Sequence, residues 1–200
     1  EKEPVRFYYF DADDNGKKEQ IITYYLGGKE LPFANKADLD KQIPSLKKKF
    51  LYAEDFAKAS LADIFDADKL RKAELHEANY FANALFINNG NFSFTVQALP
   101  WMAQLTSYND ATTVYANNDS LPDIIMTGNF YANNTQMGRY DADYGTLLLN
   151  KGRGVFEYSE LNGLLLKGEA RKVLSVHIPG IAQSFVIAKN NDSLLLIRKK

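Results

Sequence analysis

An acidic loop near the N-terminus constrains the fold of this chain more than any other stretch. Oxygen-bearing side chains recur at every second position, and a glycine and a closing carboxylate follow them in the run DADDNGKKE at residues 11–19. A hard cation such as Ca²⁺ takes about six to eight oxygen ligands around one point, and a tight loop that bends at a glycine can supply them. The spacing therefore predicts a calcium site. Its predicted ligands are the side chains of Asp11, Asp13, Asn15 and Glu19 and the main-chain carbonyl of Lys17.

The length of this loop and the segments on either side of it distinguish it from an EF-hand. The opening matches the first half of an EF-hand loop, but the closing acid comes three residues too early. Residues 5–10 and 19–26 are rich in aromatic and β-branched side chains, which predict strands. We therefore interpret the loop as the connection of a β-hairpin. An ordinary acidic turn is the alternative, because Asp, Asn and Gly also favour turns.

Composition and charge exclude several classes of protein. The chain has 200 residues and a net charge of −1, without the basic stripe that nucleic-acid binding needs. It has no cysteine, which excludes disulfides, thiolate metal sites and cysteine nucleophiles. No apolar run reaches the length of a membrane span. The chain begins at Glu1 rather than Met, from which we expect a mature or trimmed form.

Helical and strand patterns divide the rest of the chain. Residues 32–72 have apolar positions at helical spacing, with Pro44 at a helix start and a Ser60–Asp63 capping pair. Strand patterns follow at 73–78, 83–94 (two strands and a turn), 108–115, 123–130, 145–150, 155–158, 172–178, 184–189 and 193–198. We therefore expect a single, mainly β domain over residues 1–200, interrupted by a helical insertion at 32–72.

Parts of the sequence repeat. Residues 85–90 align with 147–152, since each is an apolar run that ends in Asn-x-Gly. Residues 115–123 align with the acidic loop, but Tyr115 replaces the first acid and Ser120 the glycine. We expect this second loop to be a hairpin turn that binds metal weakly or not at all. The repeated order of strand, loop, strand, excursion, strand, turn and strand is that of a four-stranded propeller blade. We predict about three blades, the last incomplete and the first containing the insertion.

These motifs resemble the FG-GAP/VCBS repeat family of β-propellers, and most of all the C-terminal part of large Bacteroidetes-type VCBS-repeat proteins. The resemblance covers roughly residues 5–30 and 79–198. It implies a partial propeller, calcium inside blades, export to the periplasm or cell surface, and binding or adhesion rather than catalysis. A trimmed start is also compatible with a lipid anchor in the full-length protein. Family propellers close with about six to eight blades. We therefore expect the remaining blades of a larger chain, or a homo-oligomer, as partners.

A polar stretch at residues 131–144 is the predicted ligand surface. Amides, arginine and tyrosine together suit contacts with a glycan or a protein, and loops on a rigid scaffold often carry function. The candidate ligand-binding residues are Asn133, Asn134, Gln136, Arg139, Tyr140, Asp141 and Asp143. We expect a non-enzymatic binding module.

Two other functions remain open at this point. A polysaccharide-degrading enzyme would use paired carboxylates, for which Asp141 and Asp143 are the candidates. However, the sequence has no Gly-x-Ser-x-Gly elbow, phosphate loop or His-Glu-x-x-His motif, and neither His76 nor His177 has an identifiable catalytic partner. A structural assembly domain would instead use the open sheet faces and edges of a partial propeller.

Overall fold

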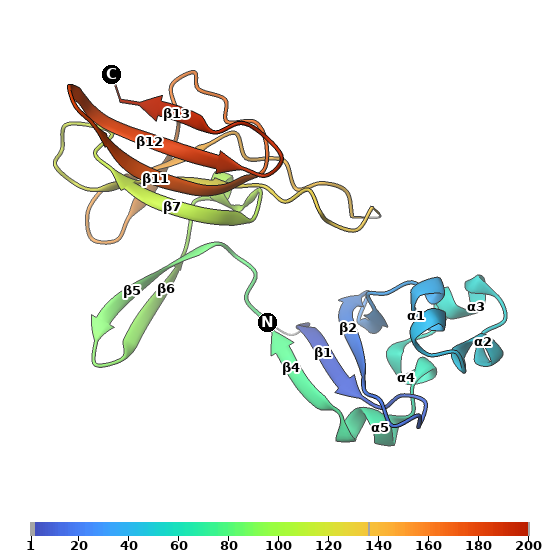
Figure 1. The fold of residues 1–200 in the computed structure, drawn as a ribbon. Coiled ribbons are helices and arrows are strands. Elements are labelled where there is room, and N and C mark those ends of the chain that lie inside the picture. The colour runs from blue at the N-terminus through green and yellow to red at the C-terminus, as the bar shows by residue number, and fades with distance from the viewer. Residues whose placement is uncertain (1–2, 136, 200) are drawn as a thin grey trace. The chain divides into compact units, whose positions relative to one another are not determined.

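The structure is a computed structural model that describes residues 3–135 and 137–199. In these residues the chain is mainly β, with four antiparallel sheets of which none closes on itself. The chain divides into two compact units, Glu1–Phe81 and Ala82–Lys200. Figure 1 colours them from blue to green and from green to red. They are called the first and the second unit below, and each is described by itself.

The first unit is built on a four-stranded sheet of order β3-β2-β1-β4. β1 (Val5–Phe10) and β2 (Glu19–Leu26) form the predicted hairpin around the acidic loop. β3 (Lys29–Pro32), which the sequence did not predict, pairs with β2 after a turn of two glycines with positive φ. β4 (Glu74–Ala78) pairs with the opposite edge of β1. The chain therefore leaves the sheet at one edge and returns at the other.

Five short helices connect β3 to β4, as the helical pattern over residues 32–72 predicted. They are α1 (Lys36–Gln42), α2 (Leu46–Lys49), α3 (Ala53–Lys58), α4 (Leu61–Ile64) and α5 (Ala67–Lys72). The predicted capping pair is present at α4, where Ser60 and Asp63 bond to each other's backbone N–H. Asn35 and Asp66 cap α1 and α5 in a similar way. Local capping therefore sets where α1, α4 and α5 begin.

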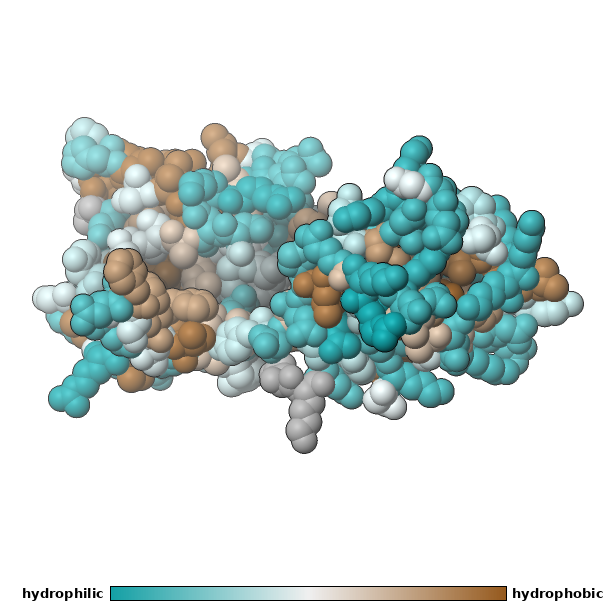
Figure 2. All heavy atoms as spheres, turned by 90° about the horizontal axis from the view of Figure 1, so that it is seen from below, coloured by the Kyte–Doolittle hydropathy of each residue, from teal (hydrophilic) through white to brown (hydrophobic). Residues whose placement is uncertain are grey.

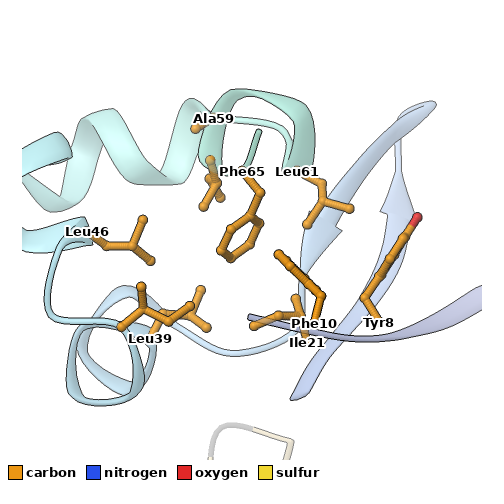
Figure 3. Packing of buried hydrophobic residues seen from close by; sticks show 10 residues of the cluster. Tyr8, Phe10, Ile21, Leu39, Leu46, Ala59, Leu61 and Phe65 are labelled. Carbon is orange, nitrogen blue, oxygen red and sulfur yellow. The ribbon is translucent and has the colours of Figure 1, made fainter. Parts of the chain in front are cut away.

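The helices and the sheet share one hydrophobic core (Figure 3). Alternation along the strands places Phe10 of β1 and Ile21 of β2 on the face that meets the helices, and both are buried. The ring of Phe10 contacts that of Phe65 edge to face, with 5.5 Å between centroids. Leu39 and Leu46 complete the cluster from α1 and α2. This packing fixes both strands at the point where the acidic loop begins and ends.

The second unit contains three antiparallel sheets. The largest has the order β10-β9-β8-β7, a second has the order β11-β12-β13, and the third is the hairpin β5-β6. Each strand overlaps a segment that the sequence predicted as strand, although β6 extends four residues beyond the predicted range of 83–94. The strands are β5 (Ala84–Gly90), β6 (Ser93–Ala98), β7 (Tyr108–Val114), β8 (Asp123–Gly128), β9 (Thr146–Asn150), β10 (Phe156–Glu160), β11 (Ala170–Ile178), β12 (Ile181–Lys189) and β13 (Leu195–Arg198). A short 3₁₀ helix, η1 (Trp101–Gln104), precedes β7.

Two of these sheets pack face to face (Figure 1). Ile125 and Leu147 of the larger sheet form one buried cluster with Phe185 and Ile187 of β12. A polar contact joins the sheets as well, because the Asp110 carboxylate accepts a hydrogen bond of 2.8 Å from the Val173 N–H. The core of the second unit therefore lies between β7–β10 and β11–β13, as in other stacked sheets.

The alignment of the two Asn-x-Gly hairpins holds in three dimensions. Asn88 pairs with Phe94 in β5–β6 as Asn150 pairs with Phe156 in β9–β10, and the remaining pairs follow the same register. In both turns the asparagine Oδ1 accepts a hydrogen bond from the N–H of the glycine two residues later. However, β9 also pairs with β8, whereas β5 pairs with no described strand except β6.

Candidate metal site and binding surfaces

The acidic loop brings three of its predicted ligands together. One carboxylate oxygen each from Asp11, Asp13 and Glu19 lies within 4.8 Å of the other two. Glu19 is buried at the start of β2, and the two aspartates are partly buried. No described lysine or arginine side chain forms an ion pair with any of the three. Three negative groups at this separation repel one another unless protons or a cation neutralise them.

Hydrogen bonds within the loop hold two of these carboxylates in place. The N–H groups of Asn15 and Gly16 donate to Asp11 at 3.1 and 2.8 Å. The Ala12 N–H donates to Oε2 of Glu19 at 2.7 Å, which ties the end of the loop to its beginning. Gly16 has a φ of +84°, a conformation that suits a residue without a Cβ. The glycine therefore makes the bend that points these N–H groups inward.

Asp13 has an unusual environment for a carboxylate. Its Oδ1 is buried and has no hydrogen-bond partner among the described residues. A buried polar atom without a partner costs free energy, and such atoms are rare in folded proteins. An oxygen of this kind beside two further carboxylates suits a cation. Asn15 and Lys17 belong to the same turn, where the Asn15 Oδ1 accepts a hydrogen bond of 2.8 Å from the Lys17 N–H.

A lysine that the sequence did not indicate lies over this loop. Lys69 of α5 donates to the carbonyl of Ala12 at 2.9 Å and pairs with the Asp14 carboxylate at 2.7 Å. Desolvation tends to raise the pKa of Asp11, but the N–H donors of the loop and the charge of Lys69 together lower it. The loop therefore favours the ionised form of Asp11, which is the form that binds a metal. No local spacing could have revealed Lys69, because the contact spans 57 residues.

The second loop shares two backbone features with the first. The Ala116 N–H donates to Oδ2 of Asp123 at 2.8 Å, just as the Ala12 N–H donates to Glu19. Ser120 has a φ of +63° at the place of the loop glycine. The predicted alignment of the two loops is therefore visible in their hydrogen bonds as well as in their spacing.

The chemistry of the second loop differs from that of the first. Its first position is Tyr115, which is exposed, and the other oxygen of Asp123 accepts a hydrogen bond of 2.8 Å from the Asn150 N–H. Protein donors thus occupy both oxygens of the closing carboxylate. In the described part of the chain, this loop forms no cluster of three metal-ligating groups. These features match a hairpin turn.

The predicted ligand surface divides between exposed and buried residues. Asn134, Arg139, Tyr140 and Asp141 are exposed, whereas Asp143 is buried. Asn133 is partly buried, with Nδ2 inaccessible to water and without a hydrogen-bond partner in the described residues, and Gln136 lies outside them. The Arg139 guanidinium lies 5.1 Å from the ring centroid of Tyr131. Most of the polar stretch is therefore available to a ligand at the surface.

Asp143 belongs to a buried hydrogen-bond network. Its carboxylate accepts hydrogen bonds from the N–H groups of Gly128 and Gly145 and from the Thr146 hydroxyl, at 3.0–3.1 Å. Asn129 bonds to both the N–H and the carbonyl of Asp143, at 2.9 and 2.8 Å. Burial raises the pKa of Asp143, although the three donors to its carboxylate oppose this effect. The network joins the two ends of the polar stretch at residues 131–144. Asn129 was not evident as a member from the sequence.

The carboxylates proposed for an enzyme lie in different surroundings. Asp141 is exposed, whereas Asp143 is buried and its oxygens already accept three hydrogen bonds from protein groups. A glycosidase needs both carboxyl groups beside the substrate. The arrangement therefore favours a structural role for Asp143.

A second polar network, at Glu30 in the first unit, was also not evident from the sequence. The Glu30 carboxylate accepts hydrogen bonds from Arg6, Tyr8, Thr23 and Tyr25 at 2.7–3.2 Å. Burial, and then the charge of Glu30, raises the pKa of Tyr8 to about 12. Every member of this network has partners, so we interpret it as a structural feature of the sheet.

Comparison of the chain with models of protein families, with curated proteins and with solved structures finds no match. Among the described residues, no helix has both the length and the apolar character needed to cross a membrane.

Proposed function

We propose that this chain is a non-enzymatic binding module whose first hairpin is stabilised by calcium. The observation that carries the proposal is the cluster of Asp11, Asp13 and Glu19, in which one oxygen is buried without a partner. Ca²⁺ would neutralise the three carboxylates and join the two ends of the loop. Asn15 and the carbonyl of Lys17 would supply further oxygen ligands, in keeping with the coordination that Ca²⁺ prefers.

The wider setting of the proposal is a partial β-propeller of the FG-GAP/VCBS type. Support comes from β7–β10, four consecutive antiparallel strands in one sheet, and from their face-to-face packing with β11–β13. The matched loops and the matched Asn-x-Gly hairpins are further support. A module of this type would act in the periplasm or at the cell surface. It would bind a glycan or a protein through the exposed side chains of residues 131–144.

Thermal melting with Ca²⁺ and with EDTA tests the metal. A ligand that binds only the folded state stabilises it by mass action, by about 2.7 kcal/mol at a hundred times its dissociation constant. For a unit of this size we expect Ca²⁺ at that concentration to raise the melting temperature of the parent by roughly 10–20 °C. Asp13→Ala should lose most of this increase, because it removes a ligand and no protein hydrogen bond is seen at its buried oxygen.

Asp14→Asn is the matched control for Asp13→Ala. It removes one negative charge from the same loop, and asparagine tolerates the φ of +62° at this position. Asp14 pairs with Lys69 and is not a proposed ligand. The control should keep its response to Ca²⁺. Equal responses of the parent and Asp13→Ala, or no response of the parent, would contradict the calcium site.

A second candidate function, assembly through an open sheet edge, is favoured by the β5–β6 hairpin. In the complete sheet, the Asn150 N–H donates to Asp123 of the neighbouring loop and Nδ2 donates to a carbonyl. Nδ2 of Asn88, at the matching position, has no partner in the described structure. Phe86 is 62% exposed, whereas its counterpart Leu148 is fully buried. In β9–β10 the corresponding edge is paired with β8 and the corresponding face is buried. The β5–β6 hairpin leaves both its edge and its face exposed.

A further inference from the structure

The second unit contains a cavity of about 250 Å³ beside the Asp143 network. Apolar residues from η1, from the turn that follows it and from the segment after β10 form one wall. The members of this wall are Met102, Leu105, Leu161, Leu164 and Leu165. Most of the other lining residues are polar or aromatic, and they are called the polar wall below. A ligand that fills the cavity therefore needs both an apolar part and a polar part.

The polar wall comes from β7, β9 and β10 and from the segments that precede β7 and β9. Tyr158 and Glu160 are two residues apart on β10 and so point to the same side of the strand. Thr146 lies opposite Glu160 in the strand pairing. The Tyr108 hydroxyl lies 2.8 Å from Oγ1 of Thr146, which in turn donates to Asp143. Two tyrosines and a carboxylate thus converge on one space.

The charge of this wall is negative and is not balanced by the other lining residues. Asp143 and Glu160 line the cavity, and no lysine, arginine or histidine of the described residues does so. Protein donors already occupy Asp143, but the Glu160 carboxylate has no ion pair or hydrogen bond within the described structure. Burial, and then the charges of Glu160 and Asp143, raises the pKa of Tyr158. A cavity with unbalanced negative charge attracts positive ligands.

We propose that this cavity binds a small organic ammonium ion that carries apolar groups. Glu160 pairs with the positive charge, and the rings of Tyr108 and Tyr158 contact it through cation–π interactions. The leucine and methionine wall takes up the apolar part. The proposal rests on the binding role proposed above for the second unit and names a ligand class for it, but it does not depend on the calcium loop.

The cavity suits this class better than a neutral sugar or a bare metal ion. A sugar needs several free hydrogen-bonding groups, whereas Thr146, Tyr108 and Asp143 are already bonded to one another or to the backbone. A metal ion needs several converging oxygen ligands, and Glu160 is the one carboxylate of the lining without a partner in the described chain. An ammonium ion with apolar substituents uses the tyrosines, the carboxylate and the apolar wall together.

Isothermal titration calorimetry of the whole chain with choline tests the proposal. The neutral carbon analogue 3,3-dimethylbutan-1-ol has nearly the same shape and serves as the matched probe. In EDTA, which keeps the calcium loop empty, we expect choline to bind with a dissociation constant of about 1 mM or below. The neutral analogue should bind at least about tenfold more weakly, because it lacks the charge that Glu160 and the tyrosines contact.

Two variants and one control locate the binding. Glu160→Gln and Tyr158→Leu should each weaken choline binding by roughly tenfold. Glu157→Gln lies on the same strand but outside the cavity, where Glu157 pairs with Lys151, and it should leave the affinity unchanged. Glu160 is exposed, so its substitution is not expected to unfold the chain.

Three results would each overturn the proposal. These are no heat of choline binding by the parent, equal binding of choline and its neutral analogue, and an unchanged affinity in Glu160→Gln. If choline does not bind while Ca²⁺ still raises the melting temperature, this proposal fails and the calcium-stabilised module stands. If choline binds and Ca²⁺ has no effect on the melting temperature, the ammonium-ion proposal stands and the calcium site fails.

Discussion

Three carboxylates of this chain differ in the hydrogen-bond donors that surround them. Glu30 is surrounded by donors from one sheet, and Asp143 by donors from the two ends of one excursion. Asp13 instead has a buried oxygen without a partner. Carboxylates that accept several hydrogen bonds hold backbone segments together, because each lost bond leaves a buried donor unsatisfied. An unpartnered oxygen that lies beside two further carboxylates, as at Asp13, points to a ligand.

Glu169 allows this reasoning to be tested at one residue. Its side chain is 2% exposed and accepts hydrogen bonds from the Tyr131 N–H at 3.3 Å, from Asn190 at 2.7 Å and from Arg171 at 2.6 Å. Burial tends to raise the pKa of Glu169, but the bonds from Asn190 and Tyr131 and the charge of Arg171 together lower it. The folded chain therefore prefers the carboxylate more strongly than the unfolded chain does.

Glu169→Gln should destabilise the second unit by about 2 kcal/mol at pH 7, because it loses charged hydrogen bonds at a buried site. Since the folded pKa is lowered, the stabilisation is present above the unfolded value of 4.5 and is lost as the pH falls through the folded value. The difference between parent and variant should therefore shrink toward pH 3. Urea unfolding at several pH values measures it. Glu157→Gln, which changes an exposed ion pair, should show a small difference at every pH.

At the scale of elements, hairpins were predictable and long-range partners were not. The β1–β2 hairpin and the two Asn-x-Gly hairpins follow from alternation and turn residues that lie close together in the sequence. β3 was missed because its four residues, Lys29–Pro32, are too few to show a period. The pairing of β4 with β1, the lysine of α5 over the acidic loop and the Asn129 network depend on contacts between distant segments, which local patterns do not encode.

The β9–β10 turn offers a test of how the β5–β6 hairpin packs. A Cβ on Gly154 would lie 2.6 Å from Cδ1 of Ile87 in β5, whereas a Cβ on Gly152 would meet nothing within 4 Å. Both glycines have a φ of about +80°, so alanine strains both backbones equally. We expect Gly154→Ala to destabilise the second unit by about 1 kcal/mol more than Gly152→Ala, because it crowds Ile87. Urea unfolding of the two variants gives the difference. Equal destabilisation would mean that the end of the Ile87 side chain moves aside at little cost and that the contact is loose.

At the scale of the whole molecule, the chain shows apolar side chains at its surface. Figure 2 shows hydrophobic residues, in brown, at the surface of the second unit. On β5–β6 the exposed ones include Phe86, Phe94 and Val96, and on β11–β13 they include Leu174 and Leu196. Exposed apolar faces of this kind commonly mark contacts with another protein surface. They support the assembly candidate without excluding the binding module.

Sedimentation velocity at several protein concentrations tests assembly through β5–β6. If the hairpin face is an interface, the parent should associate in a concentration-dependent way and Phe86→Lys should weaken that association by at least roughly tenfold, because it places a charge in an apolar contact. Phe81→Lys changes an equally exposed phenylalanine outside the hairpin and should leave association unchanged. A parent that stays monomeric at all concentrations would contradict this function.

The order of strands in the first unit has a consequence for how the chain is made. β1 is first in the sequence but lies inside its sheet, between β2 and β4, where Val5 pairs with Ala78. During synthesis one edge of β1 therefore stays open until β4, which ends 68 residues after the end of β1, has left the ribosome. Non-local strand pairing of this kind slows folding, and open edges invite mispairing. Chains released before β4 is complete should accordingly be the aggregation-prone species, however well their first hairpin has formed.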